Sequence, residues 1–327
     1  MRIRPIGALC AVLLLAMVSA WAGDPVSLDN VRDLELQVTF DAGLRHFDVH
    51  SLDGDRLAVS GMGQFIVWDL ASPAPTRSES HDGEIICLSP IRSQMAVFAR
   101  SREVEIWTVD PLVFRLSLGS LQGMSKTNGA FTLDGETFAV VNRWNEVDVW
   151  DVARGERIHT LTGLRSNVFD LAFSSDGLLL AGAGGFSSRD DQGVSLVCVW
   201  DVASGELLQS LPTDDVGDNH TILFAQEDAR LITTGHRRVL AWDTTSWERV
   251  SDGGAHPGSY GISLSPDGQL LALASDMQTV LVLDVRNLRS ARILPVLGAV
   301  HDVSFSPDGT KLVAACADGN IRIWLIP

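Results

Sequence analysis

Near the end of the chain, Ser306-Pro-Asp-Gly309 is followed by the apolar run Lys311-Leu-Val-Ala-Ala-Cys316 and then by Ile321-Arg-Ile-Trp-Leu325. An Asp-Gly pair between two apolar runs is a strong hairpin signal, because glycine accepts the positive φ angle of a tight turn. The flanking runs are rich in small and β-branched residues, which suit strands. This stretch therefore predicts consecutive antiparallel strands, the last of which carries a tryptophan.

The tryptophan segment occurs seven times along the chain. The copies are Phe65–Asp69, Val104–Thr108, Val147–Asp151, Val197–Asp201, Val239–Asp243, Val280–Asp284 and Ile321–Leu325. Their anchor positions are 68, 107, 150, 200, 242, 283 and 324, so the period is about 40 residues, and only Leu283 is not tryptophan. An apolar strand that ends in Trp-Asp at this period is typical of four-stranded propeller blades.

The Asp-Gly element keeps phase with the tryptophan segment. Ser265-Pro-Asp-Gly268 matches the last copy, and Leu52-Asp-Gly54, Leu133-Asp-Gly135 and Ser175-Asp-Gly177 are variants of it. Two elements in phase across seven copies predict seven blades in one ring.

With these elements the chain resembles the WD-repeat family over residues 34 to 327. The resemblance implies blades with strands a, b, c and an outer strand d, the Ser-Pro-Asp-Gly turn joining a to b. The last blade has no strand d of its own, and the run Leu34–Phe40 can supply it. Such pairing removes an open edge. We therefore expect an all-β, seven-bladed β-propeller of four-stranded antiparallel blades, closed by an N-terminal strand in the last blade.

The family's polar network joins a His, a Ser, an Asp and the strand-c Trp, and no blade here has all four in register. Blade 7 has only Asp318 and Trp324, and blade 2 has His81 and Trp107. We therefore expect apolar packing to hold the blades together.

Residues 1–22 are typical of a secretory signal peptide. Arg2 and Arg4 precede the apolar run Leu9–Val18, and Ala20-Trp-Ala22 has the small-x-small pattern of a cleavage site. The sequence thus predicts cleavage after Ala22, a linker over 23–33, a propeller over 34–327 and a periplasmic or extracellular location. Retention of the segment as a membrane anchor is the alternative.

The charge balance restricts the partners. The chain has 25 Lys+Arg against 41 Asp+Glu, a net charge of −16. This charge repels phosphate backbones and anionic lipids, so we expect neither nucleic-acid binding nor membrane insertion after signal cleavage. Three cysteines remain beyond the signal, Cys87, Cys198 and Cys316, and each lies in an apolar run typical of a buried, free thiol.

The interval of 50 residues between Trp150 and Trp200 indicates a long b–c loop in blade 4. This loop (184–193) and the next one (212–219) concentrate Asp190, Asp191, Asp214, Asp215 and Asp218 on one sector of the rim. The sector has three possible roles: a solvated loop, a surface for a basic protein partner, or a calcium site, although the spacing lacks the ordered ligand pattern of a calcium loop.

The same rim carries residue types that often dominate interface energy. Arg143 and Trp144 lie at a loop tip in blade 3, Phe186 and Arg189 in the blade 4 loop, and Arg237 in blade 5. With the five aspartates they form the predicted partner-binding patch, hereafter the rim patch. Trp144 covering a neighbouring blade is the structural alternative.

An enzymatic alternative is a metal-dependent hydrolase or lyase at the channel mouth, with His46, His301 and Glu84 as ligands. No hydrolase elbow or zinc-helix motif accompanies these residues. We therefore expect a monomeric, non-enzymatic scaffold for a protein partner, with no cofactor and no assigned metal site.

Overall fold

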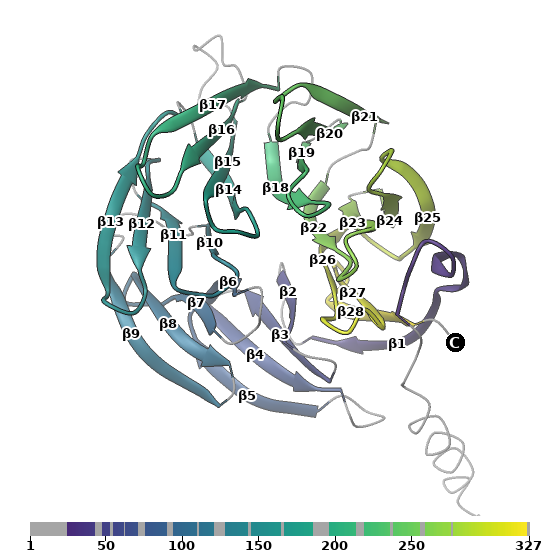
Figure 1. The fold of residues 1–327 in the computed structure, drawn as a ribbon. Coiled ribbons are helices and arrows are strands. Elements are labelled where there is room, and N and C mark those ends of the chain that lie inside the picture. Colours follow the sequence, from purple (N-terminus) through teal and green to yellow (C-terminus); the bar gives the residue numbers. More distant parts are fainter. Residues whose placement is uncertain are drawn as a thin grey trace, which may run out of the picture.

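The computed structural model describes residues 25–42, 48–52, 55–61, 63–70, 76–89, 94–109, 111–120, 128–142, 145–164, 167–185, 196–213, 219–235, 238–255, 259–275 and 277–325. These residues form seven four-stranded antiparallel sheets that are arranged in a ring, as predicted (Figure 1). In blades 1 to 6 the first strand faces the centre of the ring and the last strand lies on its perimeter, whereas in blade 7 β26 faces the centre and β1 lies on the perimeter. Within the described part of the chain, the one helical element is the short 3-10 helix η2 (Val31–Asp33).

Each of the first three blades is built from four consecutive strands. Blade 1 has β2 (Asp48–Ser51), β3 (Arg56–Gly61), β4 (Gln64–Asp69) and β5 (Thr76–Asp82). Blade 2 has β6 (Glu84–Leu88), β7 (Gln94–Phe98), β8 (Glu103–Val109) and β9 (Leu112–Ser120). Blade 3 has β10 (Gly129–Phe131), β11 (Thr137–Val141), β12 (Val147–Asp151) and β13 (Glu156–Leu161).

Blades 4 to 6 repeat this order. Blade 4 has β14 (Asn167–Phe173), β15 (Leu179–Gly185), β16 (Leu196–Asp201) and β17 (Leu207–Pro212). Blade 5 has β18 (Asn219–Ala225), β19 (Arg230–Gly235), β20 (Arg238–Asp243) and β21 (Arg249–Ala255). Blade 6 has β22 (Ser259–Leu264), β23 (Leu270–Ser275), β24 (Thr279–Asp284) and β25 (Arg289–Pro295).

Blade 7 joins the two ends of the described chain. Its strands β26 (Val300–Phe305), β27 (Lys311–Cys316) and β28 (Asn320–Leu325) are completed by β1 (Glu35–Asp41). Strand β1 pairs antiparallel with β28, from Glu35 opposite Leu325 to Asp41 opposite Asn320. The predicted closure by the N-terminal strand is confirmed, and it supplies the outer strand that the last repeat lacks.

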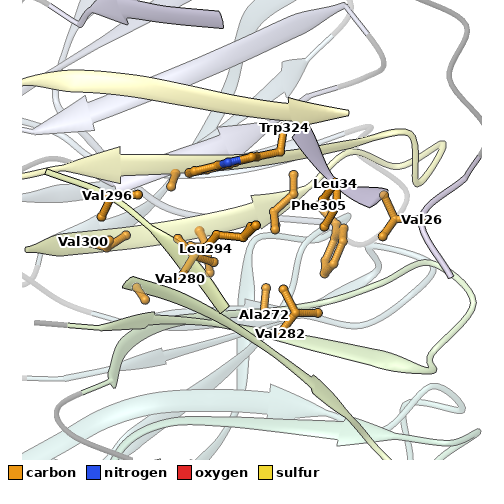
Figure 2. Close-up of a cluster of buried hydrophobic side chains, with 14 of the residues drawn as sticks. Val26, Leu34, Ala272, Val280, Val282, Leu294, Val296, Val300, Phe305 and Trp324 are labelled. Carbon is orange, nitrogen blue, oxygen red and sulfur yellow. The ribbon is translucent and has the colours of Figure 1, made fainter. Parts of the chain in front are cut away.

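Hydrophobic packing between neighbouring blades forms the core. One cluster combines β23, β24 and β25 of blade 6 with β26, β27 and β28 of blade 7 (Figure 2). Val26, Val31 and Leu34, which precede β1, pack into the same cluster. The central strands are buried on both faces, because each blade is covered by its two neighbours; all six residues of β23 and of β27 are buried. Apolar contacts between blades thus replace much of the incomplete polar network.

The anchor tryptophans differ in their surroundings. Trp200 is buried, and its indole N–H donates a 2.8 Å hydrogen bond to the Thr162 carbonyl in the connection that follows blade 3. In blade 6 the fully buried Leu283 takes the anchor position. In blade 2, Trp107 contacts the edge of His81, which stacks on Phe65 of blade 1.

The Asp-Gly turns have one geometry wherever the structure describes them. In blade 6 the Ser265 hydroxyl donates to Asp267 and accepts the Leu270 amide, while Gly268 has a φ of +69°. Blades 3, 4 and 7 repeat the arrangement around Asp134, Asp176 and Asp308. The a–b turns lie beside the c–d turns, since Val152 N–H donates to Glu136 O and Val202 N–H to Leu178 O. We call this end of the ring the Asp-Gly face.

Candidate functional site

The residues of the rim patch lie outside the described part of the chain. These are Arg143, Trp144, Phe186, Arg189, Asp190, Asp191, Asp214, Asp215, Asp218 and Arg237. The strands that carry their loops are described, and they establish where those loops begin and end. The patch itself stays a prediction.

The strand ends around blade 4 lie side by side. Gly184 pairs with Leu196, and Leu196 pairs with Pro212, so residues 186–195 and 214–218 leave from the same end of the blade. At that end of blade 5, Asn219 pairs with Gly235, next to residues 236–237. These strand ends lie at the end of the ring away from the Asp-Gly face. Strand β14 starts at Asn167, which pairs with Gly185, and it runs from there to the Asp-Gly turn at Ser174. The described strand ends of blades 4 and 5 that carry these loops therefore lie at the end of the ring opposite to the Asp-Gly face.

The loop of blade 3 is held at both of its ends. Asn142 N–H donates to the Glu146 carbonyl at 2.8 Å, and Asn145 N–H donates to the Asn142 carbonyl at 3.1 Å. The Asn142 side chain adds hydrogen bonds to the Glu146 amide and carboxylate, each 3.2 Å long. Asn145 has a φ of +59°, a conformation that Asn tolerates better than most residues. These hydrogen bonds join Asn142 directly to Asn145 and Glu146.

The inner strands enclose a central hollow of about 490 Å³. Residues of every blade line it, and its polar residues include Asp48, Asp170, Asp302, Asn128 and Thr221. The three aspartates recur in blades 1, 4 and 7 at the same place, four residues before the a–b turn begins. The metal-ligand prediction instead singled out His301, which directly precedes Asp302.

Two of these aspartates join neighbouring blades. Asp170 Oδ2 accepts the Ile222 amide of blade 5 at 3.0 Å, and its Oδ1 accepts the adjacent Leu171 amide at 2.9 Å. Asp302 bonds in the same way to Val49 of blade 1 and to Val303. Burial in the channel wall raises the pKa of Asp170 to about 7, and the amide hydrogen bonds offset only part of this shift. These carboxylates have a structural role between blades.

The proposed metal ligands do not come together among the described residues. His46 lies outside them, and Glu84 Oε1 accepts the Gly63 amide at 2.8 Å, which anchors the b–c turn of blade 1. His46 is also one residue out of register with His301, because Asp48 is the counterpart of Asp302. The described part of the chain contains no group of three His, Cys, Asp or Glu residues that could hold a metal ion.

Cys87, Cys198 and Cys316 form no disulfide bond with one another in the described part of the chain. Cys198 and Cys316 are buried, and burial raises the pKa of both thiols. A raised pKa disfavours the reactive thiolate, so both act as small apolar side chains. No described helix is long and apolar enough to cross a membrane.

The family described as "WD domain, G-beta repeat" matches residues 155–194 and 294–324. Pre-mRNA-processing factor 17 of Mus musculus is 25% identical over 238 residues, which cover 68% of this chain and 39% of that protein. Autophagy-related protein 16 of Arabidopsis thaliana is 23% identical over 281 residues, 81% of this chain and 52% of that protein. The LST8 homolog of Drosophila melanogaster is 30% identical over 186 residues, 54% of this chain and 56% of that protein.

Seven four-stranded blades, their phased repeats and these matches define the chain as a WD-repeat β-propeller. The chain spans between about a third and a half of the length of the first curated relatives that it matches.

Proposed function

We propose that this protein is an exported scaffold that holds a protein partner on the rim patch of blades 3 to 5. WD-repeat propellers typically serve as platforms for protein partners, and a rigid ring with variable loops suits that role. The observation that supports the proposal is the pairing of Gly184 with Leu196 and of Leu196 with Pro212, because these are the strand ends next to the long b–c loop and the following connection.

The chemistry of the patch favours a partner with basic and apolar groups. Five aspartates attract a basic surface and steer its approach. Trp144 and Phe186 supply apolar anchors of the kind that dominate interface energies. The partner class is thus a folded protein or segment with positive charge around an apolar contact.

In-cell cross-linking followed by mass spectrometry tests this proposal. Wild type is compared with Trp144→Ala and with a variant in which residues 186–195 are replaced by a short Gly-Ser linker. Leu297→Ser, at an exposed site between blades 6 and 7, is the matched control. We expect both patch variants to lose the same partner and the control to keep it. An unchanged set of partners in all four proteins contradicts the rim patch.

Export is tested separately by cell fractionation and intact-mass measurement. Cleavage after Ala22 gives a mature chain that begins at Gly23. A cytoplasmic chain that retains residues 1–22 contradicts export without affecting the scaffold role. Metal analysis of the same sample addresses the enzymatic alternative, because stoichiometric zinc, iron or manganese that is lost in His46→Ala/His301→Ala contradicts a purely scaffolding function.

A further inference from the structure

Two exposed leucines lie on the Asp-Gly face, in the neighbouring turns of blades 3 and 4. Leu133 is 47% exposed and Leu178 is 59% exposed. The two turns approach closely, because a Cβ atom at Gly177 would lie 3.2 Å from Thr132 Cγ2. Between them is a hollow of about 290 Å³, lined by residues 132–134 and 175–177.

This apolar character departs from the repeat. Leu133 occupies the turn position that is Pro266 in blade 6 and Pro307 in blade 7. Leu178 follows the turn glycine, where blades 6 and 7 have Gln269 and Thr310. The turn geometry is the same in all four blades, so it does not require leucine at either position. Exposed apolar residues that gather around a hollow, as in these two neighbouring turns, are a feature of interaction sites.

The surroundings of the hollow are strongly acidic. The turns at 132–136, 151–154, 174–178, 201–205 and 226–229 carry seven carboxylates against one Arg. That residue, Arg154, is already paired with Asp151 at 2.8 Å. The hollow therefore lies in a negative field, which favours a positively charged partner.

Asp134 and Asp176 flank the two leucines and are ionised at neutral pH. A hydroxyl hydrogen bond, from Thr132 and Ser174 respectively, lowers the pKa of each carboxyl, and backbone amides add to the effect. All of these bonds use Oδ1. A carboxylate has further acceptor positions, so Oδ2 of each can accept a hydrogen bond from a partner.

We propose that the Asp-Gly face of blades 3 and 4 is a second docking surface, which binds a basic segment of a partner protein. An apolar side chain of that segment fills the hollow, which Leu133 lines and which the Leu178 turn borders, and flanking Lys or Arg side chains pair with Asp134 and Asp176. A hollow of this size suits one or two side chains, since small-molecule pockets are about 300–1,000 Å³. The surface lies at the opposite end of the ring from the strand ends that carry the rim-patch loops, and the proposal does not depend on those loops.

Peptide binding to the whole mature chain, measured by fluorescence anisotropy, tests the proposal. The probe is a labelled synthetic peptide of alternating lysine and leucine, compared with peptides that have serine for leucine or glutamate for lysine. We expect Leu133→Ser/Leu178→Ser and Asp134→Asn/Asp176→Asn each to weaken binding by about tenfold. Asn retains the Oδ1 acceptor of the turn, so the second pair changes charge with little effect on the fold.

The equivalent turns of blades 6 and 7 provide matched controls. Asp267→Asn/Asp308→Asn removes the same two charges elsewhere on the face, and Leu297→Ser removes a more exposed leucine. These controls should bind the probe as wild type does. Equal weakening by the controls shows general charge attraction and overturns the proposal, as does an affinity that is unchanged in the site variants.

Two further measurements test where the probe binds and whether a second copy of the chain occupies the surface. A photo-reactive form of the probe should label residues 132–136 and 174–178 in wild type, which tests the site even if a variant fails to fold. Labelling elsewhere contradicts it. Sedimentation of wild type tests a second copy as the occupant, because a dimer that is lost in Leu133→Ser/Leu178→Ser would show that the surface covers itself. We expect deletion of residues 186–195 to leave probe binding intact. The proposal of the rim patch and the proposal of the docking surface on the Asp-Gly face can therefore fail independently of each other.

Discussion

The carboxylate of Asp302 accepts a 3.0 Å hydrogen bond from the backbone amide of Val49, although 253 positions separate the two residues. This bond joins the inner strand of the last blade to the inner strand of the first. Val49 is buried, so its amide has little access to solvent as a replacement. The bond therefore supports ring closure at the channel, as the β1–β28 pairing does at the perimeter.

Removal of this acceptor should destabilise the ring. We expect Asp302→Ala to cost about 1–3 kcal/mol, because a buried amide loses its partner. Asp302→Asn should cost less, since its amide oxygen can still accept one hydrogen bond. Thermal and urea unfolding monitored by circular dichroism measures the difference. Equal stability of all three proteins would show that the bond contributes nothing.

Asp170 should make stability depend on pH. Burial raises its pKa to about 7 in the folded state. The folded chain then binds a proton that the unfolded chain releases at pH values above its ordinary carboxyl pKa. The stability that the folded chain gains from keeping Asp170 protonated is fully present below about pH 4 and is lost as the pH rises to about 7. Asp170→Asn should therefore gain stability relative to wild type over this range, on the order of 2 kcal/mol, in parallel urea titrations; a constant difference contradicts the raised pKa.

Asp318 should show the opposite pH dependence. Its hydrogen bond with the largely buried Arg322 lowers the pKa of Asp318 to about 2. The stability from this pair is present above the ordinary carboxyl pKa and is lost as the pH falls through about 2. Asp318→Asn should destabilise the chain by about 1–3 kcal/mol at pH 7 and by much less near pH 2. A pH-independent cost would instead indicate a packing effect, and chemical denaturation at several pH values distinguishes the two.

Trp200 should stabilise blade 4 partly through its indole N–H. Trp200→Phe keeps an aromatic ring in the core but removes the donor to the Thr162 carbonyl. We expect a loss of about 1–2 kcal/mol from the missing hydrogen bond and the smaller ring. Leu283→Ala, at the equivalent position of blade 6, is the comparison, and it should cost about 2–5 kcal/mol through cavity formation alone. Melting temperatures rank the variants by stability. A Trp200→Phe variant as stable as wild type contradicts a stabilising role for the hydrogen bond from the indole N–H to the Thr162 carbonyl.

Loss of strand β1 should open the ring. Deletion of residues 23–41 removes the partner of β28 and exposes a strand edge that invites association. It also removes Phe40, which lies against Trp68 of blade 1 with ring centroids 4.9 Å apart. We expect aggregation or a broad, lowered thermal transition, measured by light scattering during chromatography and by circular dichroism. A monomer with wild-type melting shows that β1 is dispensable; deletion of residues 1–22 alone is the control.

The sequence predicted the architecture because the repeat is local. Each Asp-Gly turn brings two adjacent runs together, and the strand that ends in tryptophan lies next along the chain, so one period defines most of a blade. The closure of blade 7 was also predictable, since Leu34–Phe40 is a strand-like run that belongs to none of the seven repeats, and it pairs with β28. In blade 1 the turn is one residue shorter, and that difference placed His46 one position out of register with His301.

Contacts between blades were not predictable from the repeat. Asp170 and Asp302 looked like ordinary polar residues of inner strands, and only the ring places their carboxylates against amides of the next blade. Leu133 and Leu178 lie 45 positions apart and form one surface only because successive blades set their turns side by side. The rim patch stays a prediction, because its residues lie outside the described part of the chain.

The sequence by itself determined seven blades, their strand order and the pairing of the two ends, because backbone hydrogen bonding and hydrophobic patterning act within one repeat or at its boundary. The tertiary structure decided which side chains meet across blades. Those contacts depend on the rotation from one blade to the next, which closes the ring, places Asp170 in the channel wall and brings two leucine-bearing turns together at the Asp-Gly face.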